Sequence, residues 1–378
     1  MSARSRLLLA SVVTSSAVLL AGCWESSGST GASAPSSVTP LVSAGSAVTT
    51  SEEIPTVILP VATPGEISID GDVGTLTPQE KTSYLTSGTA NDLHETFHGS
   101  DTGYTELCSG KVDMVDSAQR ITTTQVSKCQ ANGLHVVQFE IAADAFVIAI
   151  KNETDVGGDC LTTTQVGDMF RAGSPVLTWS QLGGGYHAVA LHPAGPNETN
   201  TDFDLFGAAV FDSTSPSLLN FRSAYKAFRT DDLARKYVVG KTTRGVAPKV
   251  NGRASFFRFS YYQLYEEQLR PFEISLPGTR NCIFPSAETI TNGQYPFSRQ
   301  YMITTTTRSL QRPEVKEFLL HYLSHATSLA SAAQLVPLSQ PLIDGQKDWV
   351  NGTISAPEIA PPTKSASPTA EASDQPAS

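Results

Sequence analysis

The sequence predicts an α/β fold with a largely parallel sheet. Between about Pro60 and Gly352, short apolar or β-branched runs alternate with helix-like segments, joined by loops rich in Gly, Ser and Thr. The longest apolar run, His135 to Asn152, is typical of a strand buried on both faces. The stretch is long enough for two domains.

The first expected helix begins at Thr77, a predicted N-cap, with Pro78 at its first helical position and Gly88 as its stop. A strand at Glu66–Asp70 precedes this helix. The next expected elements are a strand at 93–100, a short helix at 102–110 and a strand or loop at 111–118.

The second half continues the alternation. We expect a capped helix at 160–173, a strand and loop at 185–195, a helix at 201–211, and a tyrosine-rich helix leading into a strand at 260–274. The clearest amphipathic helix is at 312–334, with Pro313 near its start.

The N-terminus has the layout of a secretory signal. Arg4 and Arg6 precede an apolar stretch, Leu7–Leu20, that is too short and too poorly flanked to be a membrane span. The following Leu-Ala-Gly-Cys resembles a bacterial lipoprotein signal, which implies removal of residues 1–22 and lipidation of Cys23. The alternative is a plain signal peptide with a chance cysteine. The lipoprotein interpretation predicts a protein of the bacterial cell envelope, lipid-anchored to the outer face of the membrane.

Residues 23–59 and 351–378 are rich in Ser, Ala, Thr and Pro and nearly free of large apolar residues, so they predict a flexible tether and a disordered tail. The net charge is −10, from 26 basic and 36 acidic residues, which argues against nucleic acid as a partner.

Four cysteines remain if Cys23 carries lipid, an even set in an oxidising compartment, and three disulfide pairings are open to them. They show no Cys/His grouping with metal spacing, so no metal site is expected. We find no nucleophile–base pairing either, and predict neither an enzyme nor a bound cofactor.

Three loops follow predicted strands and precede predicted helices: Asp70–Thr75, Gly99–Gly103 and Asn197–Asp202. In open α/β sheets such loops collect at the carboxyl ends of the strands, where free N–H groups bind anions. Convergence of the three loops would make an oxyanion site. The alternative is that each loop only caps its helix.

Several blocks resemble the substrate-binding proteins of phosphate ABC importers. The block at 106–129 matches in Cys108, Gly110, Asp113, Ile121 and Cys129, and further similar blocks lie at 160–182, 285–303, 312–323 and 335–340. Together they cover about Ile67 to Gln340. The resemblance implies a periplasmic-binding-protein-like α/β fold of two lobes, with a hinge and an interlobe cleft that holds the ligand.

By this resemblance, lobe 1 takes residues 60–153 and 285–350, and lobe 2 takes residues 154–284. Cys160 and Cys282 then flank the two hinge crossings, while Cys108 and Cys129 bracket one local element. The implied disulfides are therefore Cys108–Cys129 and Cys160–Cys282.

The resemblance also implies the ligand contacts, and the best matches are Gly99, Ser100 and Gly103. The full candidate set is Gly71, Asp72, Gly99, Ser100, Asp101, Thr102, Gly103, Arg120, Thr199, Asn200 and Thr201. Each loop carries an acid, namely Asp72, Asp101 or Asp202. A carboxylate about 4 Å from a bound anion opposes it by roughly 4 kcal/mol at an intermediate dielectric. The alternative is that these side chains cap helices and fill the N–H groups that phosphate would use.

The implied function is that of a lipid-anchored receptor that delivers phosphate or a related oxyanion to an ABC permease. One alternative is a divergent member that has lost phosphate and binds another small polar ligand. The other is an envelope lipoprotein that keeps the fold for sensing or protein contact.

Overall fold

The computed structural model describes residues 58–72, 76–183, 185–213, 215–240 and 251–352. Residues 1–22, Cys23 and most of the predicted tether and tail lie outside these ranges.

The strands are β1 (Glu66–Gly71), β2 (Asp92–Glu95), β3 (Met114–Ser117), β4 (Val136–Lys151), β5 (Cys160–Thr162), β6 (His192–Pro196), β7 (Lys226–Phe228), β8 (Arg253–Arg258), β9 (Leu269–Pro271), β10 (Glu273–Ser275), β11 (Ser298–Thr306) and β12 (Val336–Pro337).

The α-helices are α1 (Thr77–Thr86), α2 (Ser100–Cys108), α3 (Thr123–Ala131), α4 (Thr163–Phe170), α5 (Thr201–Phe211), α6 (Asp231–Val239), α7 (Phe259–Leu264), α8 (Ala287–Thr291), α9 (Pro313–Ala332) and α10 (Gln340–Val350). Short 3₁₀ turns are at Trp179–Leu182, Leu218–Asn220 and Ser309–Gln311. Within the described residues no helix is both long and apolar enough to cross a membrane.

The main sheet is mixed, and the expectation of a largely parallel sheet was wrong. Its strand order is β2-β1-β3-β11-β4-β8-β6-β7, with β9 and β12 also paired to β4. β1 runs parallel to β2 and β3, and β6 runs parallel to β7 and β8. The late strand β11, however, is antiparallel to both β3 and β4. β4 is antiparallel to β8 as well.

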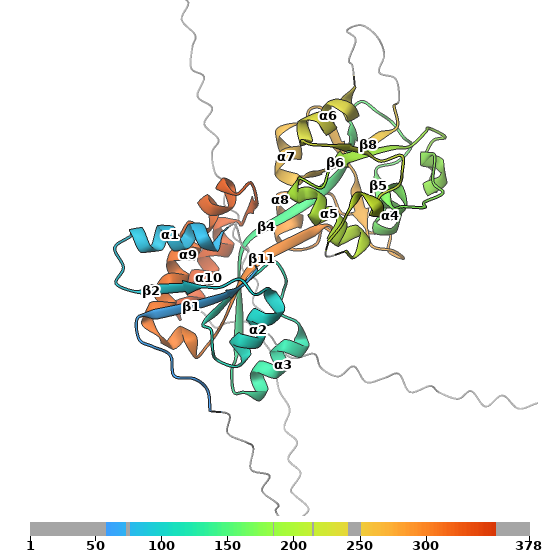
Figure 1. Ribbon diagram of the computed structural model, residues 1–378. Coiled ribbons are helices and arrows are strands. Elements are labelled where there is room, and N and C mark those ends of the chain that lie inside the picture. The colour runs from blue at the N-terminus through green and yellow to red at the C-terminus, as the bar shows by residue number, and fades with distance from the viewer. Residues whose placement is uncertain (1–57, 73–75, 184, 214, 241–250, 353–378) are drawn as a thin grey trace, which may run out of the picture. The chain divides into compact units, whose positions relative to one another are not determined.

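β4 is shared by two hydrophobic cores. One core includes β4 up to Ala142 together with β1 and α9, and the other begins at Ala143 and includes β8, α4 and α5. A smaller cluster lies between α2 and α3. Figure 1 shows α1 and α9 beside β1 and β2, and α5 and α6 beside β6 and β8. The mixed α/β, periplasmic-binding-protein-like fold is confirmed, while the predicted lobe boundaries stay predictions.

The start of α1 differs from the expectation. Its N-cap is Leu76, and Thr77 is the first helical residue, fully buried. Instead of capping the helix, the Thr77 hydroxyl donates to the Asp116 carboxylate and lies 3.0 Å from the Tyr322 hydroxyl. Thr77 thus links α1 to β3 and α9.

Both implied disulfides are present, Cys108–Cys129 and Cys160–Cys282. The first joins α2 to α3. The second joins β5 to the segment that leads to α8.

Candidate functional site

The loops after β1 and β3 and the start of α2 lie together at one edge of the sheet. β1 and β3 are parallel neighbours, so their carboxyl ends coincide. Two glycines allow the close approach. A Cβ on Gly71, which has φ of +145°, would lie 1.9 Å from the Asp116 carbonyl oxygen, and one on Gly103 would lie 3.0 Å from Val115 Cγ1. The backbone of α2 therefore packs directly on the strand ends.

The Asp72 carboxylate occupies the donors that these loops present. Its Oδ1 accepts from the Ser100 backbone N–H at 3.0 Å, and its Oδ2 accepts from the Ser100 hydroxyl at 2.5 Å and the Ala118 N–H at 3.3 Å. Ser100 is the first residue of α2, whose N-cap Gly99 has no side chain. The carboxylate is thus an anion bound at a helix N-terminus, where the helix dipole favours negative charge.

A second layer of hydroxyls supports this arrangement, which we call the Asp72 cradle and define by Asp72, Ser100, Ser117 and Ala118. The Ser100 and Ser117 hydroxyls are 2.5 Å apart, and Ser117 Oγ also accepts from the Gln119 N–H at 2.9 Å. Both serines are buried. The cradle is a preorganised set of donors around one carboxylate.

A buried acid lies directly behind the cradle. Burial, together with the charges of Asp72 and Glu95, raises the pKa of Asp116 to about 7, against the lowering effect of the Thr77 hydroxyl. Its backbone carbonyl accepts from the Asp72 N–H at 2.9 Å. A proton on Asp116 therefore limits the negative charge next to the cradle.

Several predicted contacts lie outside the cradle. Asp101 and Thr102 are exposed on α2, and the Asp101 carboxylate accepts from Gln125 Nε2 at 3.1 Å. The Arg120 side chain is about half exposed and forms an ion pair with Glu140. Nothing in the sequence distinguished the loop acids Asp72, Asp101 and Asp202. In the structure only the Asp72 carboxylate accepts hydrogen bonds from the donors of the cradle.

The third predicted loop begins α5 in the other core. Asn200 is the N-cap, and its side chain accepts from the Asp202 N–H at 2.9 Å. Thr199 and Thr201 are exposed. Asp202 is buried and faces Arg258 at the end of β8, with Oδ1 3.2 Å from Nε.

Arg258 belongs to a partly buried charge cluster with Asp144, Asp202, Asp231 and Arg299. Arg258 Nη2 lies 3.2 Å from Asp144 Oδ2, and Arg299 Nη2 lies 3.5 Å from the same oxygen. Arg299 and Asp144 are register partners on β11 and β4. Burial raises the pKa of Asp144 and Asp202, although Arg258 lowers both, and burial raises the pKa of Asp231 to about 6.

The cluster is incompletely hydrogen-bonded. Among the buried atoms of the described residues that lack a hydrogen-bond partner are Asp144 Oδ2, Arg258 Nε and Arg299 Nε. Each guanidinium group therefore forms ion pairs with the acids, but its Nε–H donor has no hydrogen-bond acceptor. Sequence reasoning missed both arginines. Arg299 lies in the block at 285–303, which resembles the binding proteins of phosphate importers. Its place in that block was the signal that could have identified it as a site residue.

These features define a binding protein of the α/β type, with donor loops at the carboxyl ends of strands and two cores carried on a shared strand. The chain belongs to the PBP superfamily, since the model of the PBP superfamily domain matches residues 88–325.

Similar proteins include protein SphX of Synechococcus elongatus, 22% identical over 243 residues, which cover 64% of this chain and 67% of that protein. Protein SphX of Synechocystis sp. is 24% identical over 256 residues, covering 66% and 70% respectively.

Among solved structures, a possible phosphate binding protein from Planctomyces limnophilus aligns with a TM-score of 0.62 and 22% identity, over 78% of this chain and all of that one. PstS from Borrelia burgdorferi aligns with a TM-score of 0.55 and 13% identity, over 73% and 99% respectively. These likenesses bear on the fold.

Proposed function

We propose that this protein is an extracytoplasmic solute-binding protein that captures phosphate or a related oxyanion and delivers it to an ABC permease, with lipid on Cys23 as its membrane anchor. The observation that carries the proposal is the Asp72 cradle, because its donors already hold an anionic group. Membership of the PBP superfamily and the similarity in fold to a possible phosphate binding protein from Planctomyces limnophilus support the same ligand class.

In this proposal the ligand is held by two sets of donors. Ser100 supplies a backbone N–H and a hydroxyl at the start of α2, and Ala118 supplies a backbone N–H after β3. Arg258 and Arg299 supply guanidinium groups whose Nε atoms lack hydrogen-bond partners. Arginine suits the second role, because its planar donors match an oxyanion bidentately. Closure of the two lobes around the ligand would bring both sets to it.

Asp72 decides which oxyanion is accepted. A fully ionised anion placed beside the carboxylate meets a repulsion of about 4 kcal/mol per charge at 4 Å and an effective dielectric of about 20. A protonated oxyanion such as hydrogen phosphate can instead donate its hydroxyl to Asp72. The proposal therefore favours oxyanions that carry a proton at neutral pH over sulfate.

Isothermal titration of the purified protein with phosphate, arsenate and sulfate tests this proposal. We expect micromolar or tighter binding of phosphate and arsenate, at least tenfold weaker binding of sulfate, and loss of binding in Arg299→Gln. Asp101→Asn is the control, because Asp101 is exposed and bonded to Gln125. Absence of heat at millimolar phosphate would refute the proposal.

A second candidate rests on the same cradle. Because Asp72 already fills the donors, the chain is alternatively a divergent member that binds another small polar ligand, or a sensor or interaction lipoprotein. A thermal-shift screen against sugars, amines and other anions separates these cases. A stabilising neutral or cationic compound, together with no response to phosphate, would favour this second candidate.

A further inference from the structure

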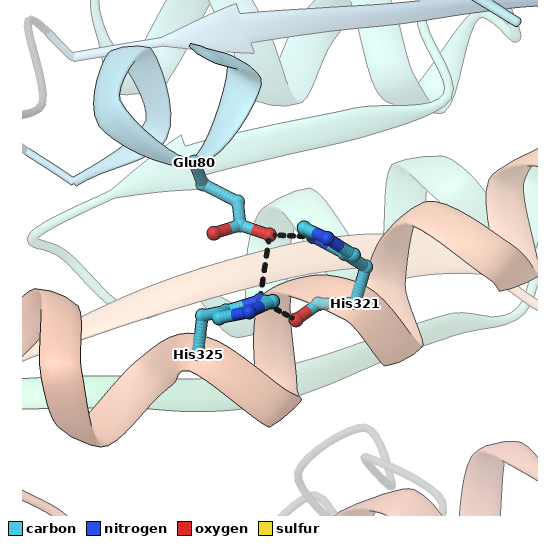
Figure 2. Close-up of side chains that lie close together, drawn as sticks. All are labelled: Glu80, His321 and His325. Atoms are coloured by element: carbon cyan, nitrogen blue, oxygen red, sulfur yellow. Dashed lines mark hydrogen bonds and ion pairs between the residues drawn. The ribbon is translucent and has the colours of Figure 1, made fainter. Parts of the chain in front are cut away.

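Glu80, His321 and His325 form a compact group away from the Asp72 cradle. Glu80 lies on α1, and the two histidines lie one turn apart on α9 (Figure 2). One ligand-type atom from each of the three lies within 4.8 Å of the others. Residues four apart on a helix share one face, so both imidazoles meet the same carboxylate.

Packing between α1 and α9 fixes this geometry. The Tyr84 ring packs edge-on against Phe318 and His321, with ring centroids 5.1 and 5.2 Å apart. Phe318, Leu319 and Tyr322 of α9 are buried in the same core as Tyr84. The three side chains are therefore carried by two rigid helices, as a precise site requires.

The carboxylate of Glu80 is only half satisfied. The side chain has no exposed surface, and its Oε1 faces Nδ1 of both histidines, at 3.6 Å for His325 and closer for His321. Its Oε2 is buried and has no hydrogen-bond partner. A buried polar atom without a partner is costly, and an unrecorded ion is one of its recognised explanations.

The charges of the group suit a cation. Glu80 is the one carboxylate of the three side chains and is fully buried. A divalent cation would balance this carboxylate without requiring either histidine to be protonated.

We propose that Glu80, His321 and His325 bind a divalent transition-metal ion, with zinc the best match. Two imidazoles and one carboxylate suit zinc, cobalt, nickel or copper, whereas magnesium and calcium prefer oxygen ligands alone. Three protein ligands leave a fourth position for water or an exogenous anion.

Access to the site is from the side of His325, whose side chain is 41% exposed, against 20% for His321. In the metal-free arrangement His325 Nδ1 lies 2.9 Å from the His321 carbonyl oxygen. That contact suits a ligand histidine, because donation from one ring nitrogen to a carbonyl leaves the other free for metal.

Zinc titration of the purified full-length protein, followed by calorimetry, tests the proposal. We expect one high-affinity zinc per chain and a thermal midpoint that rises with zinc and returns on addition of EDTA. Cobalt should give the absorption bands of a four-coordinate site. The variant His325→Ala should weaken zinc binding at least tenfold, and so should Glu80→Gln.

The matched control is His94→Ala, because His94 is also exposed, at 59%, and pairs with a single aspartate. We expect zinc affinity in this variant to equal that of the wild type. Because Glu80 is buried, Glu80→Gln can also lose zinc through unfolding, so the result for the exposed His325 decides the test. Equal zinc affinity in His325→Ala and the wild type, or no stoichiometric zinc in the wild type, would overturn the proposal.

Discussion

Replacing Asp72 by asparagine removes the charge from the cradle while keeping the size of the side chain. In the wild type the carboxylate accepts from the Ser100 N–H, the Ser100 hydroxyl and the Ala118 N–H. Asparagine retains one acceptor oxygen, but its NH₂ group takes the place of the other carboxylate oxygen and cannot accept a hydrogen bond. The donors are then free to bind an exogenous anion.

The magnitude follows from the lost repulsion. A unit charge about 4 Å from the carboxylate is opposed by about 4 kcal/mol at an effective dielectric of about 20. Each tenfold change in affinity corresponds to about 1.4 kcal/mol, so sulfate, which has no proton to donate to Asp72, should bind about 10²- to 10³-fold tighter to Asp72→Asn. Phosphate, which can donate its hydroxyl to Asp72, should gain less. The folded protein should lose about 1–3 kcal/mol, because a charge-assisted acceptor is replaced and a donor faces the Ala118 N–H.

Calorimetric titration with sulfate and urea denaturation measure the two effects. Asp101→Asn should change sulfate affinity less than twofold, since Asp101 contacts Gln125 on the exposed face of α2. Unchanged or weaker sulfate binding in Asp72→Asn would refute the argument that the Asp72 charge opposes an ionised ligand at the cradle.

Three further predictions concern stability. Arg258→Gln leaves buried carboxylates without their main partner and should cost about 3–5 kcal/mol in the free energy of unfolding, seen in urea denaturation; an unchanged midpoint would show that the pairs are not stabilising. Asp116 has a folded pKa of about 7 against an ordinary value of 3.8, so the folded state holds the extra proton between these values. Its contribution should be complete below about pH 4, fall as the pH rises, and level off above 7, by roughly 4 kcal/mol at most; Asp116→Asn should remove this part of the pH dependence, and parallel stability curves for the two proteins would contradict the assignment. Loss of the Cys160–Cys282 bond, which spans 122 residues, should cost about 5 kcal/mol by chain entropy, measured for the double Ser variant, and a loss below about 1 kcal/mol would contradict that estimate.

Local pattern was enough to predict the elements with a strong period or composition. β4 was predicted from its long apolar run and α9 from its sustained amphipathic repeat, because each pattern lies within one continuous stretch of the sequence. The insertion of β11 between β3 and β4 was not predicted, because it pairs Ser298 with Ala145, and no local signal encodes such a partner. The parallel-sheet expectation was wrong for that reason.

The candidate site was predictable in position more than in detail. The loops at Gly71 and Gly99 were identified, but a loop acid can point into the donors, as Asp72 does, or toward solvent, as Asp101 does. The direction of each acid side chain depends on how helix α2 is oriented relative to the ends of β1 and β3, and the spacing of residues in the sequence does not determine that orientation. His321 and His325 were not predicted as a site, because their partner Glu80 comes from a helix far away in the sequence and meets them only through the packing of α1 against α9.

The position of β11 has a consequence for how the chain folds. Strands β1 to β4 leave the ribosome or translocon first, but the gap between β3 and β4 is filled only when residues 298–306 arrive. Until then β3 and β4 each present an unpaired edge, which favours aggregation or chaperone capture. Closing the sheet also requires ordering the long intervening segment, so folding should be slow and governed by non-local contacts. A chain truncated before Ser298 should therefore fail to complete its first core.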